Sequence, residues 1–335
     1  MQTFIHAALR DTAEGREAER ILRACVHCGF CNATCPTYQL LGDERDGPRG
    51  RIYLIREMLQ TDSATRETQV HLDRCLTCRS CETTCPSGVE YNQLLEIGRA
   101  VMEKKVERPV TERIQRAALA RTIPEPSRLK PLLKLAGLAK PVLPAPLAKS
   151  VPGKLPAREP WPGCDHARSV LLLEGCVQSV THPGINLATA RVLDRLGIRA
   201  VPASGCCGAL SHHLSYEEKA IATMKRNIDH WWPQVEAGAE AVLLTASGCA
   251  PTVQDYGRLL AGVPGYEEKA ERLSGMAMDI SQFLEQQDLS SFRRPENGDR
   301  KLAFHAPCSL QHGLKRAGRV ERMLGALGFN LVPVR

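Results

Sequence analysis

Two matched cysteine runs near the N-terminus, and alternating strand-like and helix-like segments after residue 167, predict a multi-domain protein. We expect a small α-helical domain followed by an α/β domain with a parallel sheet. The 335 residues suffice for two or three domains, and an apolar content of 43% can form a proper core. The expected boundaries are 1–110 for the helical domain, 111–166 for a Pro/Lys-rich linker and 167–335 for the α/β domain.

The two cysteine runs have identical spacing. They read Cys25-x2-Cys28-x2-Cys31-x3-Cys35-Pro36 and Cys75-x2-Cys78-x2-Cys81-x3-Cys85-Pro86. In this ferredoxin-type spacing a short loop holds a 4Fe–4S cluster with three thiolates, and the fourth cysteine, before a proline, binds the neighbouring cluster. We therefore predict two electron-carrying clusters. The expected ligands are Cys25, Cys28, Cys31 and Cys85 for cluster one, and Cys75, Cys78, Cys81 and Cys35 for cluster two.

Two other interpretations of these cysteines are less satisfactory. A zinc module also uses paired cysteines, but four ligands per ion give no reason for the repeated third cysteine or the Cys-Pro ending. A disulfide framework would suit a secreted protein, yet the N-terminus has no apolar signal segment before its first charges. Fourteen cysteines without such a segment indicate a reducing compartment, so we expect a cytoplasmic protein with no membrane span.

Composition and motifs also narrow the function. Aromatic residues make up only 4% of the chain, which argues against a base-stacking nucleic-acid surface, and the net charge of +7 is a mild excess. A redox-sensing regulator would need a nucleic-acid-reading element, and no basic recognition helix is evident. No GxGxxG motif follows a strand, so the chain shows no flavin or dinucleotide site of its own.

Helical periodicity in the first domain falls beside the cysteine runs. We expect helices at 14–24, 50–60 and 89–106, so that a cysteine loop followed by a helix occurs twice. Nearby arginines would raise a cluster's reduction potential, but for any single one we favour a solvated or paired state. The arginines considered are Arg23, Arg49, Arg51, Arg74 and Arg79, with Asp43, Glu44, Asp46 and Glu57 as expected partners.

Prolines are dense across 123–163, where they are expected to block long helices and sheet pairing. Within this linker, the stretch 129–149 alternates small apolar patches with lysines. A solvated arm with partly buried leucines is the favoured interpretation, and contact with an anionic bilayer on the inner face of the membrane is the alternative. Cys164 fits no pattern and is interpreted as incidental.

The first four strand-like runs of the second domain each end near a cysteine. We expect strands at 169–174, 198–201, 241–245, 301–304 and 331–334, and an amphipathic helix at 185–196. Ligands of parallel sheets lie at the carboxyl ends of the strands. The cysteines there are candidates for a third redox site: Cys176, Cys206, Cys207, Cys249 and Cys308.

The short sequence motifs around these cysteines resemble those of a known group of proteins. GCVQ (175–178), GCCGALSHHL (205–214), TASGCAPTV (245–253) and HAPCSLQHG (305–313) are similar to CCG-domain proteins, which include heterodisulfide reductase and lactate-utilisation proteins. Together with CVHCGFCNATCPTYQLLGDERDGPRGRIYLIREM (25–58) and LDRCLTCRSCETTCPSGVEYNQLLEIGR (72–99), the chain resembles the iron–sulfur subunits of bacterial glycolate oxidase (glycolate dehydrogenase).

This resemblance implies a fold and a division of labour. The helical domain would be of the ferredoxin type found in succinate dehydrogenase and fumarate reductase iron–sulfur subunits. A separate flavoprotein would oxidise glycolate to glyoxylate, or D-lactate to pyruvate, and this chain would carry the electrons to a quinone or another acceptor. The alternative partner is a lactate or anaerobic glycerol-3-phosphate dehydrogenase.

The resemblance also implies elements that this chain lacks. The family has a second CCG after the HxPC element of Cys308, so we expect the sequence to be C-terminally truncated. Complete cysteine sets of heterodisulfide reductases hold a noncubane 4Fe–4S cluster. Here Thr252 replaces one cysteine beside Cys249, which leaves a further cluster and redox-active thiols as alternatives.

Overall fold

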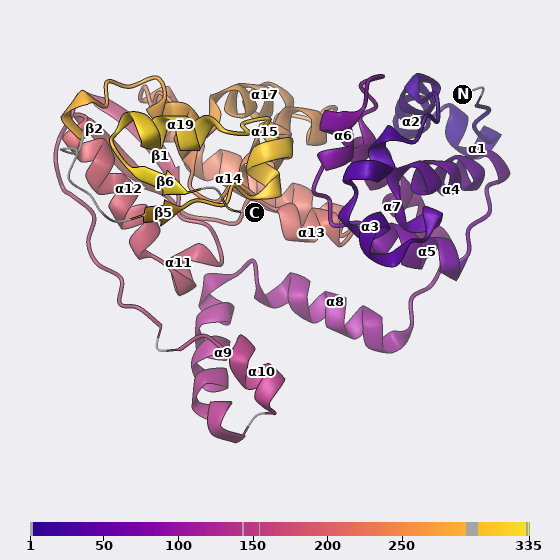
Figure 1. The fold of residues 1–335 in the computed structure, drawn as a ribbon, viewed down its shortest axis with the longest axis horizontal. Coiled ribbons are helices and arrows are strands. Elements are labelled where there is room, and N and C mark those ends of the chain that lie inside the picture. Colours follow the sequence, from indigo (N-terminus) through magenta and orange to yellow (C-terminus); the bar gives the residue numbers. More distant parts are fainter. Residues whose placement is uncertain (1–2, 143, 154, 293–300, 333, 335) are drawn as a thin grey trace. The chain divides into compact units, whose positions relative to one another are not determined.

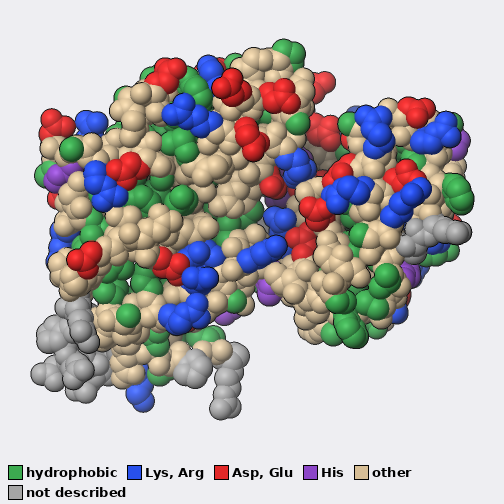
Figure 2. Space-filling model, turned by 90° about the horizontal axis from the view of Figure 1, so that it is seen from above, with side chains coloured by type: hydrophobic (Ala, Val, Ile, Leu, Met, Phe, Trp, Pro, Cys, Tyr) green, Lys and Arg blue, Asp and Glu red, His purple; other side chains and the backbone are tan. Residues whose placement is uncertain are grey.

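The computed structural model describes residues 3–142, 144–153, 155–292, 301–332 and 334 (Figure 1). The chain forms two compact units, Met1–Arg113 with Ala306–Ala317, and Ile114–His305 with Gly318–Arg335. Within the described ranges, none of the helices combines the length and apolar character needed to cross a lipid bilayer. On the face drawn in Figure 2, Lys and Arg side chains lie among Asp and Glu side chains, in keeping with the modest net charge.

The first unit consists of short helices. The Thr12 hydroxyl caps α2 by accepting the backbone N–H of Gly15, and Pro48 begins α4, where its missing N–H costs no helical hydrogen bond. The predicted helices at 14–24, 50–60 and 89–106 are confirmed within two residues as α2, α4 and α7. The elements are α1 (Ala7–Arg10), α2 (Ala13–Ala24), η1 (Phe30–Thr34), α3 (Pro36–Leu41), η2 (Glu44–Asp46), α4 (Pro48–Thr61), α5 (Arg66–Asp73), α6 (Ser80–Thr84), α7 (Tyr91–Lys105) and the π-helix η5 (Ser309–Gly313).

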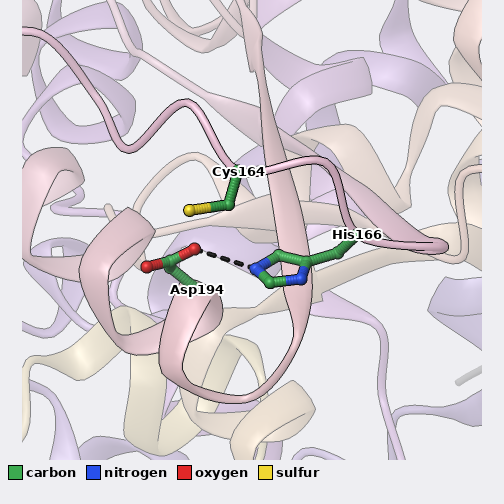
Figure 3. A group of neighbouring side chains, drawn as sticks. All are labelled: Cys164, His166 and Asp194. Carbon is green, nitrogen blue, oxygen red and sulfur yellow. Dashed lines mark hydrogen bonds and ion pairs between the residues drawn. The ribbon is translucent and has the colours of Figure 1, made fainter.

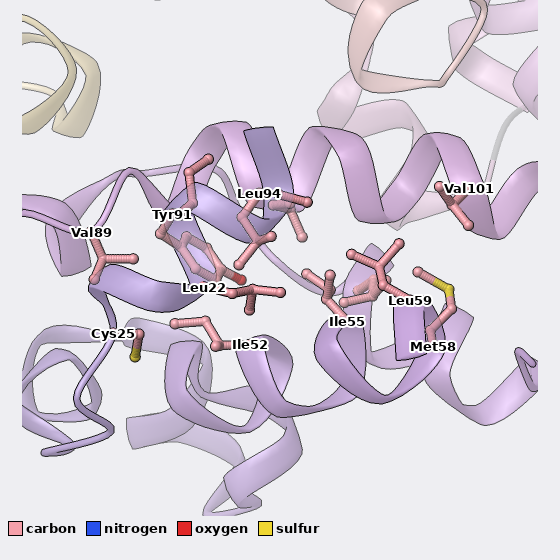
Figure 4. Packing of buried hydrophobic residues seen from close by; sticks show 14 of the residues in the cluster. Leu22, Cys25, Ile52, Ile55, Met58, Leu59, Val89, Tyr91, Leu94 and Val101 are labelled. Atoms are coloured by element: carbon pink, nitrogen blue, oxygen red, sulfur yellow. The ribbon is translucent and has the colours of Figure 1, made fainter. Parts of the chain in front are cut away.

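Helices α2, α4 and α7 enclose the core of this unit (Figure 4). Leu22, Ile55 and Leu94 are each 0% exposed, and the core extends to Cys25 and Cys81 of the cysteine runs. Helix α7 comes close to α4 at Gly98, where a Cβ atom would lie 2.8 Å from Ile55 Cγ1. The cysteine loops are therefore attached directly to a packed hydrophobic core.

The second unit contains a parallel sheet in the order β2-β1-β3-β4. Strand β1 pairs with β2 from Arg168 opposite Ile198 to Leu173 opposite Ala203. Its core includes Val170 and Leu172 of β1 and Leu193 of α12. The parallel-sheet prediction is confirmed. The strands are β1 (Arg168–Leu173), β2 (Ile198–Ala203), β3 (Val242–Leu244), β4 (Ala277–Asp279), β5 (Lys301–Ala303) and β6 (Asn330–Val332).

Two features of the strands differ from the expectation. Strand β4 was not predicted, because its three residues lie directly between two helices without turn residues to mark them. The last two predicted strands, β5 and β6, pair with each other in parallel and form a separate two-stranded sheet. In the second unit the helical elements after β1 are α11 (Gln178–Thr181), α12 (Gly184–Arg195), α13 (Ala209–His213), α14 (Glu217–Glu236), α15 (Ala250–Gln254), α16 (Tyr256–Leu259), α17 (Glu267–Met276), α18 (Ile280–Leu284), η4 (Ser290–Phe292) and α19 (Arg319–Ala326).

The proline-dense segment is helical as far as Ser150, so the expectation that its prolines block long helices is wrong. It contains α9 (Pro126–Ala139), η3 (Lys140–Val142) and α10 (Ala145–Ser150), and α8 (Val110–Thr122) directly precedes it. Pro126 lies in the first turn of α9, where the fixed φ of proline suits a helix, and only Pro131 lies inside it. Pro124 and Pro144 fall between helices. Whether a helix forms in this segment therefore depends more on where its prolines lie than on how many there are.

Candidate functional site

The first cysteine loop connects α2 to α3. Cys25 is the C-cap residue of α2, and Cys35 precedes Pro36 in the first turn of α3. Between them the backbone is left-handed at His27 (φ 61°) and Gly29 (φ 88°). Left-handed residues bend the chain sharply, so closely spaced cysteines can face one point. The loop geometry is therefore suited to presenting several sulfurs to one group.

The second loop repeats this backbone. Thr77 (φ 52°) and Arg79 (φ 61°) are left-handed at the positions equivalent to His27 and Gly29. Such a conformation costs a non-glycine residue roughly 1–2 kcal/mol, and a β-branched threonine adopts it rarely. The duplication seen in the cysteine spacing thus extends to the backbone, even where the residue types differ.

Two solvent-open hollows lie beside these loops. The first, of about 430 Å³, is lined by Cys25, Cys28, Cys31, Cys81 and Cys85. The second, of about 370 Å³, is lined by Cys35, Cys75, Cys78 and Cys81. Cys85 thus lies with the first run, Cys35 lies with the second, and Cys81 borders both hollows. Each hollow therefore collects thiols from both runs.

The spread of these thiols fits a polynuclear cluster better than a single ion. A tetrahedral zinc ion with Zn–S bonds of about 2.3 Å holds its sulfurs roughly 3.8 Å apart. Among the residues that the structure describes, two groups bring three ligand atoms within 4.8 Å of one another, and neither includes a cysteine of the two runs. A four-iron cube separates its four thiolates more widely, so the residues present fit such a group.

Burial and crowding keep several of these thiols protonated until they bind a metal. Burial, together with the neighbouring thiols of Cys25 and Cys85, raises the pKa of Cys31 to about 11. Burial also raises the pKa of Cys78, with Cys75 among the groups that add to the effect. Because a metal binds thiolates, cluster assembly must displace these protons.

Three polar groups approach sulfurs in the hollows. The Tyr91 hydroxyl lies 3.7 Å from Cys75 Sγ, to which it donates, and the Val89 N–H donates to Cys85 Sγ at 3.5 Å. Thr37 Oγ1 lies 3.2 Å from Cys35 Sγ. Hydrogen bonds to ligand sulfurs stabilise the reduced, more negative cluster and raise its reduction potential.

Arg51 is a buried cation beside the second hollow. Its side chain is 1% exposed, its Nε donates to the His71 carbonyl at 2.8 Å, and its guanidinium lies 3.2 Å from Thr37 Oγ1. The Asp46 carboxylate lies 3.5 Å away and also binds Arg74 at 2.9 Å. Burial opposes the ionisation of Asp46, but hydrogen bonds from His71 and Arg74 hold its pKa below the ordinary value.

This network is an ion-pair arrangement rather than a metal site. Asp43, Asp46 and His71 bring ligand atoms within 4.8 Å of one another, but Arg45 pairs with Asp43 at 2.8 Å and Arg74 with Asp46. The arginine cations already neutralise these carboxylates, so a metal ion would have to displace them.

The other four arginines near the cysteines are paired, as expected for any single arginine. Two have partners that the sequence suggested: Arg49 binds Glu44 and Arg74 binds Asp46. The remaining pairs are Arg23 with Glu19 and Arg79 with Glu82. Arg51 differs from all of them by its burial, so it is the strongest candidate for an electrostatic effect on a cluster.

Four cysteines of the second unit form a chain of thiols at the carboxyl ends of strands. Hydrogen bonds link Cys176 to Cys206, Cys206 to Cys207, and Cys207 to Cys249. Hydrogen bonds donated to Cys206 by the thiols of Cys176 and Cys207, and by the Gly208 N–H at 3.5 Å, lower the pKa of Cys206. Cys206 and Cys207 are buried. We call this group the thiol tetrad.

The backbone of the tetrad is held by buried polar side chains. The Tyr256 hydroxyl donates to the Cys207 carbonyl at 2.9 Å, and Asn227 Nδ2 donates to the Cys206 carbonyl at 2.7 Å. Gly205 has φ 132°, and a Cβ atom there would lie 2.5 Å from Asn227 Oδ1. A glycine is therefore required where the chain turns into the two adjacent cysteines.

Cys308 belongs to the segment Ala306–Ala317, which is part of the first unit. The pKa of Cys78 is raised mainly by burial and, to a smaller extent, by the nearby thiols of Cys75 and Cys308. Cys308 therefore lies near Cys78. The same segment is joined to α6 by a hydrogen bond of 2.9 Å between Thr83 Oγ1 and His312 Nδ1. The structure thus places this candidate beside the second cysteine run.

Cysteine-lined hollows in a helical unit and a thiol tetrad on a parallel sheet define an iron–sulfur protein of the electron-transfer class. Family models agree: one described as a 4Fe–4S dicluster domain matches residues 21–89, and one described as a cysteine-rich domain matches residues 170–254. The expected 4Fe–4S cofactors and the combination of a helical and an α/β domain are confirmed.

Comparison with known proteins identifies the family. The chain is 52% identical to the glycolate oxidase iron–sulfur subunit of Escherichia coli K12, over 100% of this chain and 82% of that protein. It is 29% identical to the probable glycolate oxidase iron–sulfur subunit of Bacillus subtilis 168, over 93% and 76%. Lactate utilization protein A of Geobacillus thermodenitrificans is 29% identical over 49% of this chain and 68% of its own length. No solved structure matches.

The chain therefore belongs to the family of glycolate oxidase iron–sulfur subunits, which confirms the resemblance found in its sequence. The assignment of individual cysteines to clusters and the third redox site remain predictions. Sequence reasoning missed Cys164, which the structure places beside His166 and Asp194. The Cys-x-His spacing was a signal for this group, whereas nothing in the sequence pointed to Asp194.

Proposed function

We propose that this protein is the electron-transfer subunit of a glycolate-oxidising flavoenzyme complex. A flavoprotein partner removes two electrons from glycolate to give glyoxylate, and this chain passes them on singly, because each 4Fe–4S cluster accepts one electron at a time. The observation that carries the proposal is the pair of hollows lined by thiols of both runs. Family membership supports glycolate as the substrate of the complex.

The proposed ligands are crossed between the runs. Cluster one is held by Cys25, Cys28, Cys31 and Cys85, and cluster two by Cys75, Cys78, Cys81 and Cys35. The presence of Cys85 in the lining of the first hollow and of Cys35 in that of the second supports this crossing.

Iron content and electron flow test the proposal together. Anaerobically reconstituted protein should hold about eight irons per chain, and Cys28→Ser should lose one cluster signal in electron paramagnetic resonance and abolish glycolate-dependent quinone reduction. Glycolate oxidation by the flavoprotein with an artificial acceptor should persist. The matched control is Cys164→Ser, which lies outside both hollows and should keep all the cluster iron. Fewer than about four irons in the wild-type protein would exclude the two-cluster relay.

The alternative partner is a flavoprotein that oxidises lactate or glycerol 3-phosphate. The relatives named lactate utilization protein A favour keeping this alternative, although they align with only about half of this chain. Co-purification with each flavoprotein, followed by turnover on glycolate, D-lactate and glycerol 3-phosphate, separates these functions. Binding of a lactate flavoprotein without activity on glycolate would replace the first proposal.

We further propose that helix α9 attaches the protein to an anionic lipid surface near a quinone acceptor. Leu135 and Leu138 are 64% and 80% exposed on α9, and Val142, just beyond it, is 84% exposed. Lys130, Lys134 and Lys140 accompany this apolar stripe, a combination that favours interfacial binding. Leu135→Asp should reduce flotation with anionic vesicles several-fold. The control Leu40→Asp, an exposed leucine of α3, should leave flotation unchanged.

The thiol tetrad, with Cys308 as a fifth candidate, is proposed as a third redox site. Two forms are considered, a further cluster or redox-active thiols. The linked sulfurs of Cys176, Cys206, Cys207 and Cys249 support a shared redox role. Iron analysis of Cys206→Ala separates the forms: a further cluster requires iron beyond about eight per wild-type chain and its loss in the variant. Unchanged iron and unchanged electron transfer to the acceptor would exclude both forms.

A further inference from the structure

Three side chains of different ligand types meet beside the first strand of the second unit (Figure 3). Cys164 and His166 lie just before β1, and Asp194 lies in the last turn of α12. The ligand atoms of all three lie within 4.8 Å of one another, and His166 Nε2 is 2.8 Å from Asp194 Oδ1. None of the three lines either cysteine-lined hollow.

The order of contacts argues against a nucleophilic thiol. In a Cys–His–Asp catalytic arrangement the imidazole lies between the thiol and the carboxylate and takes the thiol proton. Here the carboxylate lies between the other two, because Asp194 hydrogen-bonds both Cys164 and His166. The hydrogen bond to Asp194 raises the pKa of the Cys164 thiol, so the thiol is not activated as a nucleophile.

We propose that Cys164, His166 and Asp194 form a binding site for a divalent transition-metal ion of the zinc class. Thiolate, imidazole and carboxylate are all ligands of zinc, and three protein ligands with one water complete a tetrahedron. The group lies at the surface: Cys164 is exposed, and the side chains of His166 and Asp194 are 28% and 29% exposed. Water therefore has access to the fourth position.

The distances require only small movements. A tetrahedral ion with bonds of about 2.0–2.3 Å separates its ligand atoms by roughly 3.3–3.8 Å. The His166–Asp194 contact at 2.8 Å would open slightly, and the other two separations, each no more than 4.8 Å, would close by about 1.5 Å at most. Cys164 is free to make this adjustment, because its side chain is not packed into the core.

The charges balance when an ion binds. The thiol of Cys164 releases one proton to solvent, and the Nε2 proton that His166 donates to Asp194 is exchanged through solvent for one on Nδ1. The thiolate, the Asp194 carboxylate and His166 Nε2 then donate lone pairs to the ion. Hydrogen bonds from Cys164 and His166 lower the pKa of Asp194, so its carboxylate is ionised at neutral pH. Two anionic ligands then neutralise a divalent cation, and no oxidant or reductant is required.

Nearby charged groups leave the site available. Arg199 lies 3.6 Å from Asp165, and Arg191 lies 3.2 Å from Glu159, so these two arginines have carboxylate partners outside the site. An ion bound here would join the segment entering β1 to helix α12. Trp161, three residues before Cys164, already packs against the core that contains Leu193. The ion would thus fix the entry of the chain into the sheet.

Cobalt(II) titration of the cluster-loaded protein tests the site, because thiolate-bound tetrahedral cobalt gives a charge-transfer band and intense visible absorption. Wild-type protein should bind one more equivalent of thiolate-bound cobalt than Cys164→Ser, and zinc should displace it. His166→Gln should weaken this binding at least tenfold. The matched control is Asp165→Asn, a neighbouring carboxylate with a side chain 96% exposed, and it should bind cobalt like wild type.

Comparison with Cys164→Ser also removes any cobalt bound by the thiol tetrad, which both proteins share. Equal cobalt stoichiometry in wild type and Cys164→Ser would overturn the proposal. The proposal would also be overturned if Cys164→Ser lost cobalt while both His166→Gln and Asp194→Asn bound cobalt as strongly as wild type. A second readout is thermal unfolding, in which zinc should raise the midpoint of wild type and Asp165→Asn but not of Cys164→Ser.

Discussion

Replacing the buried cation Arg51 by methionine should lower the reduction potential of cluster two. Arg51 borders the second hollow, and its guanidinium contacts Thr37 Oγ1 at 3.2 Å, which in turn lies 3.2 Å from Cys35 Sγ. Loss of this positive charge makes the added electron less stable. Methionine fills similar space without the charge, so the change is mainly electrostatic.

The distance of the Arg51 guanidinium from Cys35 Sγ determines the size of the expected shift in reduction potential. A unit charge at about 6 Å in an effective dielectric of about 20 contributes roughly 2.8 kcal/mol, which is on the order of 120 mV for a one-electron couple. The Asp46 carboxylate, 3.5 Å from Arg51, cancels part of this field. We therefore expect a decrease of about 50–100 mV.

The assay is an anaerobic redox titration followed by electron paramagnetic resonance of the reduced clusters. Arg51→Lys keeps the charge and should retain most of the potential, which separates electrostatics from packing. Arg49→Met is the matched control, because Arg49 borders the first hollow and pairs with Glu44. The reasoning would be refuted if Arg51→Met left the potential of cluster two unchanged or raised it, or if Arg51→Lys lowered it equally.

Three further predictions concern packing and sulfur chemistry. Gly98→Ala should destabilise the first unit by about 1–3 kcal/mol in thermal unfolding, because the new Cβ would clash with Ile55. The control is Gly137→Ala in α9, where a Cβ meets nothing within 4 Å, and this change should be neutral or stabilising. Tyr91→Phe removes the hydroxyl that donates to Cys75 Sγ and should lower the potential of cluster two by tens of mV; an equal shift in the exposed control Tyr53→Phe would contradict this. Cys206→Ala removes the acceptor that raises the pKa of Cys176, so alkylation of Cys176 at pH 8, measured by mass spectrometry, should accelerate; slower alkylation would contradict the hydrogen-bond order.

Local signals in the sequence were sufficient for the three helices that enclose the core of the first unit. The spacing of eight cysteines, the Cys-Pro endings and the apolar periodicity beside them predicted the loops and helices α2, α4 and α7. Strand β4 escaped prediction because three residues carry too little periodicity to be recognised. Helix α9 was not predicted, because the number of prolines does not show whether they lie at the start of a helix or in its interior. The domain boundaries at 110 and 166 remain predictions.

The special roles of individual polar residues depend on tertiary packing. Arg49 and Arg51 lie only two residues apart in the sequence, yet only Arg51 is fully buried. Cys164 and His166 gain their third neighbour only because α12 brings Asp194, 28 residues after His166, beside them. Such differences arise from contacts between distant segments, which residue type and spacing do not encode.

The exchange of cysteines between the two hollows constrains how the protein is made. Cys85 borders the first hollow although Cys25, Cys28 and Cys31 of the same lining precede it by more than fifty residues in the chain, so neither hollow is complete before the ribosome has passed the second run. Iron delivered to a shorter nascent chain would meet an incomplete set of thiols. Maturation is therefore expected to follow release of both runs from the ribosome, and failure to fill one hollow should leave the other poorly formed.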